Sequence, residues 1–93
     1  MDPLDPLFPH LLRTARMLLG WDQAELSAYT GLSRAFISRL ERGDRVGQAR
    51  KLIQLRDALR AAGVAFEVAD GYLAVRLEGQ RAREVQQRHS RGE

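Results

Sequence analysis

The chain has 93 residues, which suit one domain. It has no cysteine, so disulfides and thiolate zinc sites are excluded, and no apolar run approaches the roughly 18–20 residues of a membrane span. The formal net charge is +3 and the first residues lack the basic segment of a secretory signal, so we expect a soluble, cytoplasmic protein without metal or cofactor.

Four helices are predicted over residues 6–19, 23–30, 33–42 and 48–62. Leucine and alanine recur at helical spacing in the first and the last of them. Asp22 followed by Glu25 is typical of a capping box at the start of the second helix, and Ser33 is placed to cap the third. Gly31 lies between these two helices, in a turn that favours a positive φ. The arrangement predicts a helix-turn-helix, which can place its second helix in the major groove of DNA.

Positive charge gathers around the third predicted helix. From residue 34 to residue 60 there are eight lysines and arginines against three acidic residues, which creates a local positive field. If Ile37 and Leu40 face the core, the residues that we predict to contact DNA bases face outward: Arg34, Ala35, Ser38 and Arg39. Arginine suits this position because its planar fork can donate two hydrogen bonds to guanine. Phe36 is either partly exposed beside them or packed at a helix junction.

A second set of residues is predicted to contact phosphates: Gln23, Ser33, Arg42, Arg45, Arg50 and Lys51. Gln23 lies in the first turn of its helix, where a side-chain amide and backbone N–H groups can bind a phosphate together. Capping alone would explain Ser33, and each basic residue taken singly could be a solvated surface charge. The prediction therefore depends on the cluster as a whole.

The pattern changes to alternation over residues 64–77. Asp70-Gly71 is a strong signal for a two-residue hairpin turn. The register that follows places six large apolar residues on one face, with Val64 opposite Leu77, Phe66 opposite Val75 and Val68 opposite Leu73. Residues 78–93 are polar and arginine-rich, and are read as a frayed helix or a flexible tail. The domain is thus predicted over residues 1–77.

The sequence resembles the Cro and phage-repressor helix-turn-helix family, also called the XRE family. The resemblance covers about residues 10–62 and rests on Arg16, Gly20, residues 23–26, 31–33 and 37–43, and the leucines of the following helix. It implies a mainly α, lambda-repressor-like bundle that binds operator DNA as a dimer. It also implies a phosphate-binding role for Gln23, base-reading positions at Arg34, Ala35 and Arg39, and a structural salt bridge between Arg16 and Glu41.

The chain departs from this family after the fourth helix, where the family's last helix is replaced by the hairpin. The departure puts the family's helical dimer interface in doubt. In place of that interface, we expect a homodimer that forms through the apolar face of the hairpin. The residues expected at this interface are Phe66, Val68, Leu73, Val75 and Leu77. The alternative is a hairpin that lies on its own helices without a partner.

The preferred function is a sequence-specific DNA-binding transcription regulator, a homodimeric repressor on an inverted-repeat operator in double-stranded DNA, with autoregulation as a further option. The alternative is an antitoxin or adaptor that binds a partner protein and also regulates its own gene. That reading needs residues 78–93 to fold on the partner, and Val85 is their only large apolar anchor. An enzyme is not expected, because His10 and His89 lie near opposite ends and no phosphate loop or nucleophile–base pattern is present.

Overall fold

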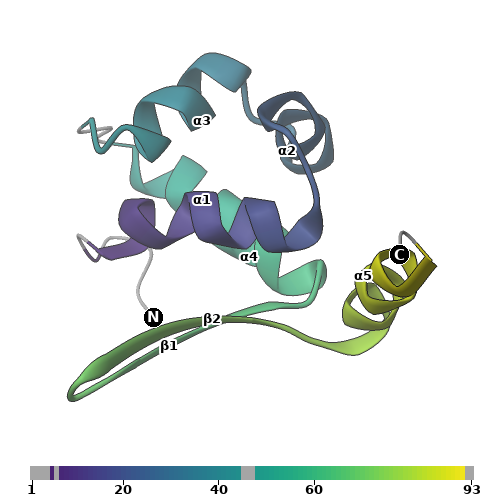
Figure 1. The fold of residues 1–93 in the computed structure, drawn as a ribbon. Coiled ribbons are helices and arrows are strands. Elements are labelled where there is room, and N and C mark those ends of the chain that lie inside the picture. Colours follow the sequence, from purple (N-terminus) through teal and green to yellow (C-terminus); the bar gives the residue numbers. More distant parts are fainter. Residues whose placement is uncertain (1–4, 6, 45–47, 92–93) are drawn as a thin grey trace.

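The structure is a computed structural model that describes residue 5 and residues 7–44 and 48–91. Its elements, in chain order, are α1 (Leu7–Leu19), α2 (Gln23–Thr30), α3 (Arg34–Glu41), α4 (Ala49–Ala61), β1 (Val64–Ala69), β2 (Tyr72–Leu77) and α5 (Gly79–Arg91). Figure 1 shows the first four helices stacked together, with the hairpin running beneath α1 and extending beyond it, and α5 to one side. The predicted fold, a helix-turn-helix bundle followed by a hairpin, is confirmed.

The helix starts and ends follow from local chemistry. Asp22 and Glu25 form the capping box of α2, in which each side chain accepts a hydrogen bond from the other's backbone N–H. The Ser33 side chain caps α3 by accepting a hydrogen bond from the backbone of Phe36. Gly31 ends α2 with a φ of 77°, a conformation that glycine adopts at little cost. These contacts fix the turn between α2 and α3.

The core lies between the first four helices and continues to the base of the hairpin. Its largest fully buried side chains are Phe8, Phe36, Leu12, Leu19, Leu26, Ile37, Leu40, Leu55 and Leu59. Phe36 therefore packs inside, which settles the alternative that the sequence left open. Leu18 of α1 and Ile53 of α4 are exposed, so the buried faces of these two helices are narrower than their apolar residues alone would suggest.

The hairpin has the predicted register, with Val64 opposite Leu77 and Val68 opposite Leu73. Its base packs on the bundle, where β2 contacts α1 and β1 contacts α4. The chain enters it through Gly63, which has a φ of 98° and whose carbonyl accepts a hydrogen bond of 2.8 Å from the backbone of Glu78. A Cβ at Gly63 would lie 2.5 Å from the Glu78 carbonyl oxygen, so this close approach requires glycine.

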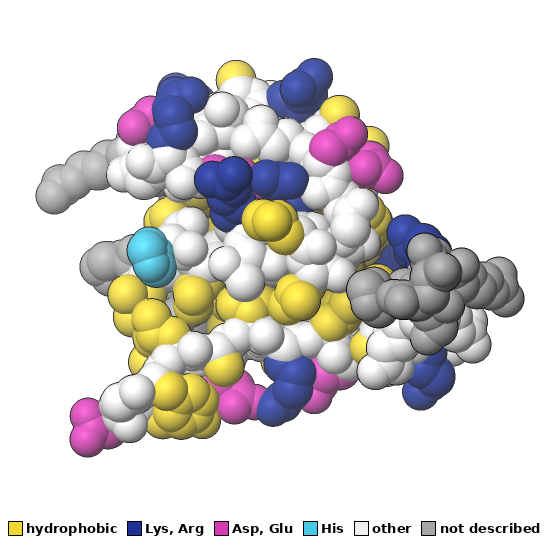
Figure 2. Space-filling view, in the orientation of Figure 1, with side chains coloured by type: hydrophobic (Ala, Val, Ile, Leu, Met, Phe, Trp, Pro, Cys, Tyr) yellow, Lys and Arg dark blue, Asp and Glu magenta, His cyan; other side chains and the backbone are white. Residues whose placement is uncertain are grey.

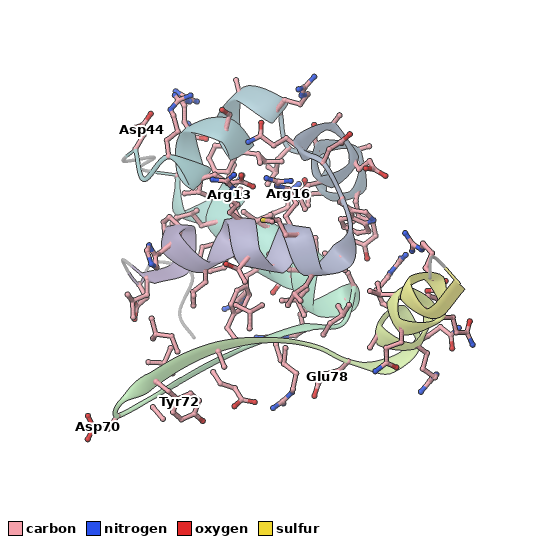
Figure 3. The ribbon with its side chains drawn as sticks, viewed as in Figure 1. Arg13, Arg16, Asp44, Asp70, Tyr72 and Glu78 are labelled. Atoms are coloured by element: carbon pink, nitrogen blue, oxygen red, sulfur yellow. The ribbon has the colours of Figure 1, made fainter. Side chains whose placement is uncertain are left out.

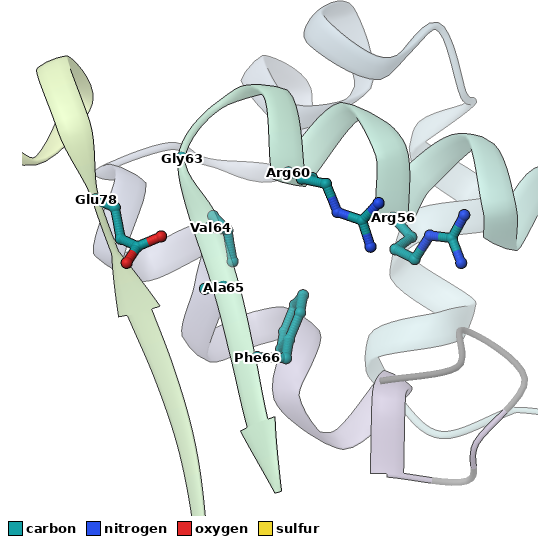
Figure 4. A pocket seen from close by; sticks show the side chains of 7 residues that line it. All are labelled: Arg56, Arg60, Gly63, Val64, Ala65, Phe66 and Glu78. Atoms are coloured by element: carbon teal, nitrogen blue, oxygen red, sulfur yellow. The ribbon is translucent and has the colours of Figure 1, made fainter.

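A hollow of about 310 Å³ lies between α4 and β1, and Figure 4 shows the residues that line it: Arg56, Arg60, Gly63, Val64, Ala65, Phe66 and Glu78. Its charges are mixed. Arg56 forms an ion pair with Asp57, and Glu78 forms one with Arg76. The hollow therefore follows from the way α4 meets the hairpin, and its lining gives no uniform field that would select an anion.

The segment after the hairpin is α5, where the sequence favoured a flexible tail and left a frayed helix as the other option. This helix contacts α1. The Arg81 guanidinium lies 5.4 Å from the centre of the Trp21 ring, within the range of a cation–π interaction. Apolar periodicity could not predict this helix, because an arginine on an aromatic ring supplies part of its contact.

Candidate nucleic-acid interface

The outer face of α3 carries the residues that were predicted to read bases. Arg34, Ala35 and Arg39 are exposed and Ser38 is half-buried, while the opposite face of the helix is buried in the core. Figure 2 shows Lys and Arg side chains over the part of the molecule where α2 and α3 lie. The structure thus brings the four predicted residues together on one exposed ridge of a short, capped helix.

Arg39 on this ridge and Arg42 at the end of α3 are held in different ways. Arg39 donates from Nε to the Ala35 carbonyl at 3.4 Å, a long hydrogen bond that leaves its terminal nitrogens available. Arg42 donates to the Ser38 hydroxyl at 3.2 Å and forms an ion pair of 3.1 Å with Asp44. Since both partners of that pair are exposed, water and salt screen it and a phosphate can replace Asp44 at little cost.

Behind the ridge, Arg16 of α1 and Glu41 of α3 form the salt bridge that the family resemblance implies. Arg16 donates from Nε at 2.7 Å and from Nη2 at 3.0 Å to the two carboxylate oxygens, and from Nη1 to the Trp21 carbonyl at 2.8 Å. The side chains are only 13% and 5% exposed. The Arg16 guanidinium thus joins three points of the fold: the last turn of α1, the end of α3 and the turn before α2.

The hydrogen bond to Glu41 raises the pKa of the Arg16 guanidinium above its ordinary value, and this effect outweighs the lowering by burial. The negative charges of Glu41 and Asp22 act in the same direction. Arginine is already protonated throughout the range in which proteins are studied. The Arg16 guanidinium therefore remains charged and acts as a lasting orienting contact between α1 and α3.

Gln23 is the predicted phosphate ligand at the start of α2, and it joins this cluster. Its side-chain amide donates a hydrogen bond of 3.2 Å to Glu41. An amide nitrogen has a second proton, and its oxygen accepts, so Gln23 keeps capacity for a ligand while Glu41 holds its orientation. The helix dipole and the first N–H groups of α2 favour an anion at the same place.

The other predicted phosphate ligands lie around the ends of α3 and the start of α4. Ser33 uses its hydroxyl oxygen to cap α3 and retains its proton for donation. Arg50 and Lys51 are exposed in the first turn of α4, and the Lys51 ammonium lies 5.4 Å from the centre of the Phe36 ring. Gln48 makes no side-chain cap there. Arg45 lies outside the described residues.

Arg13 is a basic residue that sequence reasoning missed. It is exposed on α1, one turn before Arg16, and Figure 3 shows both side chains on the side of α1 that faces α3. The helical spacing of three residues was a signal that could have found it. Arg13 extends the basic surface from α3 onto the first helix.

The residues predicted for dimerisation divide into two groups. Phe66, Val75 and Leu77 are partly buried and pack against the core of their own chain, as the alternative of a hairpin on its own helices supposed. Val68 and Leu73 remain 50% and 45% exposed. They lie opposite each other near the turn, where the hairpin extends past the bundle (Figure 1).

The model of the Helix-turn-helix family matches residues 12–61, which is more than half of the chain. The chain therefore belongs to this family, and it is of the Cro and XRE type that its sequence resembles. No curated protein and no solved structure matches it. The family is a DNA-binding regulatory one, so the protein is a DNA-binding transcription regulator. None of the helices over the described residues is long and apolar enough to cross a membrane.

Proposed function

We propose that the protein is a cytoplasmic, homodimeric repressor that binds an inverted-repeat operator, which can include the promoter of its own gene. The observation that supports this most is the two-sided character of α3. Its inner face is anchored in the core and by the Arg16–Glu41 pair, and its outer face presents three exposed residues suited to base edges. A rigid support and a free reading face are what a recognition helix needs.

Within this proposal α3 enters the major groove. Arg34 and Arg39 donate to guanine edges, and Ala35 lies against a thymine methyl, with Ser38 beside them. Gln23 and Ser33 bind phosphates at the two helix starts, and the basic residues around α4 continue along the backbone: Arg42, Arg45, Arg50 and Lys51. Repression is steric, because a dimer on its operator occludes the polymerase.

We propose that the dimer forms through the outer half of the hairpin. Val68 and Leu73 present apolar side chains that their own bundle does not cover. Both strands of a two-stranded sheet also have an unpaired edge, which a second copy can pair. Phe66, Val75 and Leu77 support this surface from beneath by fixing the hairpin to the helices.

A charge on the apolar face tests the dimer. Leu73→Asp places it there, and Ala69→Asp is the matched control, since Ala69 is exposed on the opposite face of the same hairpin. Sedimentation equilibrium should give the mass of two chains for the wild type and for Ala69→Asp, and of one chain for Leu73→Asp. A wild-type mass of one chain, or an unchanged mass for Leu73→Asp, would contradict the hairpin dimer.

Selection from a pool of random duplexes tests the operator. The wild type should enrich an inverted repeat whose half-sites are about 10 base pairs apart, centre to centre, because two recognition helices on one face of DNA are one helical turn apart. Enrichment of single, unpaired half-sites would contradict binding as a dimer. Transcription from a template with the selected site should fall as protein is added, whereas a rise would identify an activator.

A further inference from the structure

We propose that α5 is a second DNA-contacting element, which places Arg88 on a backbone phosphate next to the one bound at the start of α2. The inference rests on the proposed binding of DNA by α2 and α3. It assigns a role to a segment that lies outside the matched region of the family, residues 12–61. Three observations carry it: the charge of α5, the face by which it packs, and the place where it packs.

The helix α5 carries a net positive charge of its own. Residues 79–91 contain four arginines and one glutamate, while the rest of the chain contains eleven lysines and arginines and eleven acidic residues. The formal charge of α5 is therefore +3, and it adds to the positive charge of residues 34–60. A short helix with this net charge gives a positive field at the surface beside it.

One face of α5 turns toward the end of α1. Arg81, Val85 and Arg88 fall on this face because they are spaced by four and three residues. Arg81 lies over the Trp21 ring and is 4.0 Å from Glu84. Val85 is half-buried. Arg81 and Val85 fix the position of α5, and this fixes the position of Arg88 in the next turn of the helix.

Arg88 reaches the turn that leads into α2. Its Nη1 atom lies 3.7 Å from the position that a Cβ on Gly20 would occupy. Gly20 is followed by Trp21 and then by Asp22 and Gln23, the cap and first residue of α2. Arg88 is exposed, and among the described residues it forms no hydrogen bond or ion pair. The Arg88 guanidinium thus lies beside Gly20, three residues before α2 begins at Gln23.

The turn before α2 is also held in place by two contacts of Trp21. The Trp21 ring lies 4.8 Å from the Tyr29 ring, and the Trp21 carbonyl accepts the hydrogen bond from Arg16. One aromatic residue thus links the Arg16–Glu41 pair to α5.

The experiment uses the full chain and a fluorescein-labelled 30-base-pair duplex of random sequence. Arg88→Gln is compared with Arg83→Gln, which removes the same charge from an exposed residue on the opposite face of α5. Binding is measured by anisotropy from 50 to 200 mM salt. The slope of log affinity against log salt should be less steep by about 0.9 for Arg88→Gln alone, because one phosphate contact is lost.

That slope means that the affinity ratio of wild type to Arg88→Gln falls by about threefold between the two salt concentrations. Arg88→Lys should restore most of the slope, since it keeps a point charge. Equal slopes and affinities for Arg88→Gln and Arg83→Gln would overturn the proposal. If the wild type binds the duplex but Arg88→Gln and Arg83→Gln have the same slope and affinity, only the contact by α5 is refuted. If the wild type does not bind the duplex, DNA binding itself is refuted.

Discussion

Replacing Glu41 by leucine removes the acceptor on which Arg16 depends. The two hydrogen bonds from Arg16, of 2.7 and 3.0 Å, are lost together with the one from Gln23, and the guanidinium keeps only its bond to the Trp21 carbonyl. Removing one partner of a buried pair costs about 3–5 kcal/mol, because the other charge is left uncompensated. Since Arg16 is 13% exposed and water can reach part of it, we expect the lower end, about 3 kcal/mol.

Urea unfolding followed by Trp21 fluorescence measures this loss. At a slope of about 1 kcal/mol per molar urea, the midpoint should fall by about 3 M. The double variant Arg16→Met, Glu41→Leu is the control, since it leaves no unpaired charge and should recover much of the stability. All samples must be measured at the same protein concentration, because dimerisation contributes to the apparent stability. A loss below about 1 kcal/mol for Glu41→Leu, typical of an exposed pair, would refute the reasoning.

Three further substitutions follow from the contacts. Arg39→Ala should cost about 1–3 kcal/mol on the selected operator and relax base preference, and an equal loss on random DNA would show that Arg39 contacts only phosphate. Gly63→Asn should lower the melting temperature more than Gly71→Asn does. Both glycines have a positive φ, but only at Gly63 would a Cβ meet the Glu78 carbonyl. Equal decreases in melting temperature would contradict this steric argument. Val75→Asp should destabilise even a monomeric variant through an unpaired charge against the core, and an unchanged melting temperature would contradict that packing.

The elements with local signals could be predicted from the sequence. The capping box of Asp22 and Glu25 and the Ser33 cap involve residues three apart, so their spacing alone determines them. The hairpin register follows from a two-residue turn and strict alternation. In each case the interacting groups are neighbours in the chain, and tertiary structure had little to add.

The features that depend on distant contacts could not be predicted in the same way. Nothing local says whether Phe36 faces inward, because its place on the α3 wheel lies at the edge of the buried stripe. The helix at α5 is polar and has one apolar anchor, so its contact with Trp21 is invisible to hydrophobic periodicity. The hairpin residues were correctly paired, but which of them cover the core depends on where the bundle ends, as at Phe66 and Leu73.

The most direct test of the central claim is fluorescence anisotropy of the full chain with the DNA upstream of its own gene and with a shuffled control, at two salt concentrations. Phosphate contacts are lost as salt rises, whereas base contacts discriminate sequence at any salt. A sequence-specific regulator should prefer the native duplex, and the preference should persist at the higher salt. Equal affinity for both duplexes that disappears with salt would contradict base reading by α3 at that site and leave only a basic surface.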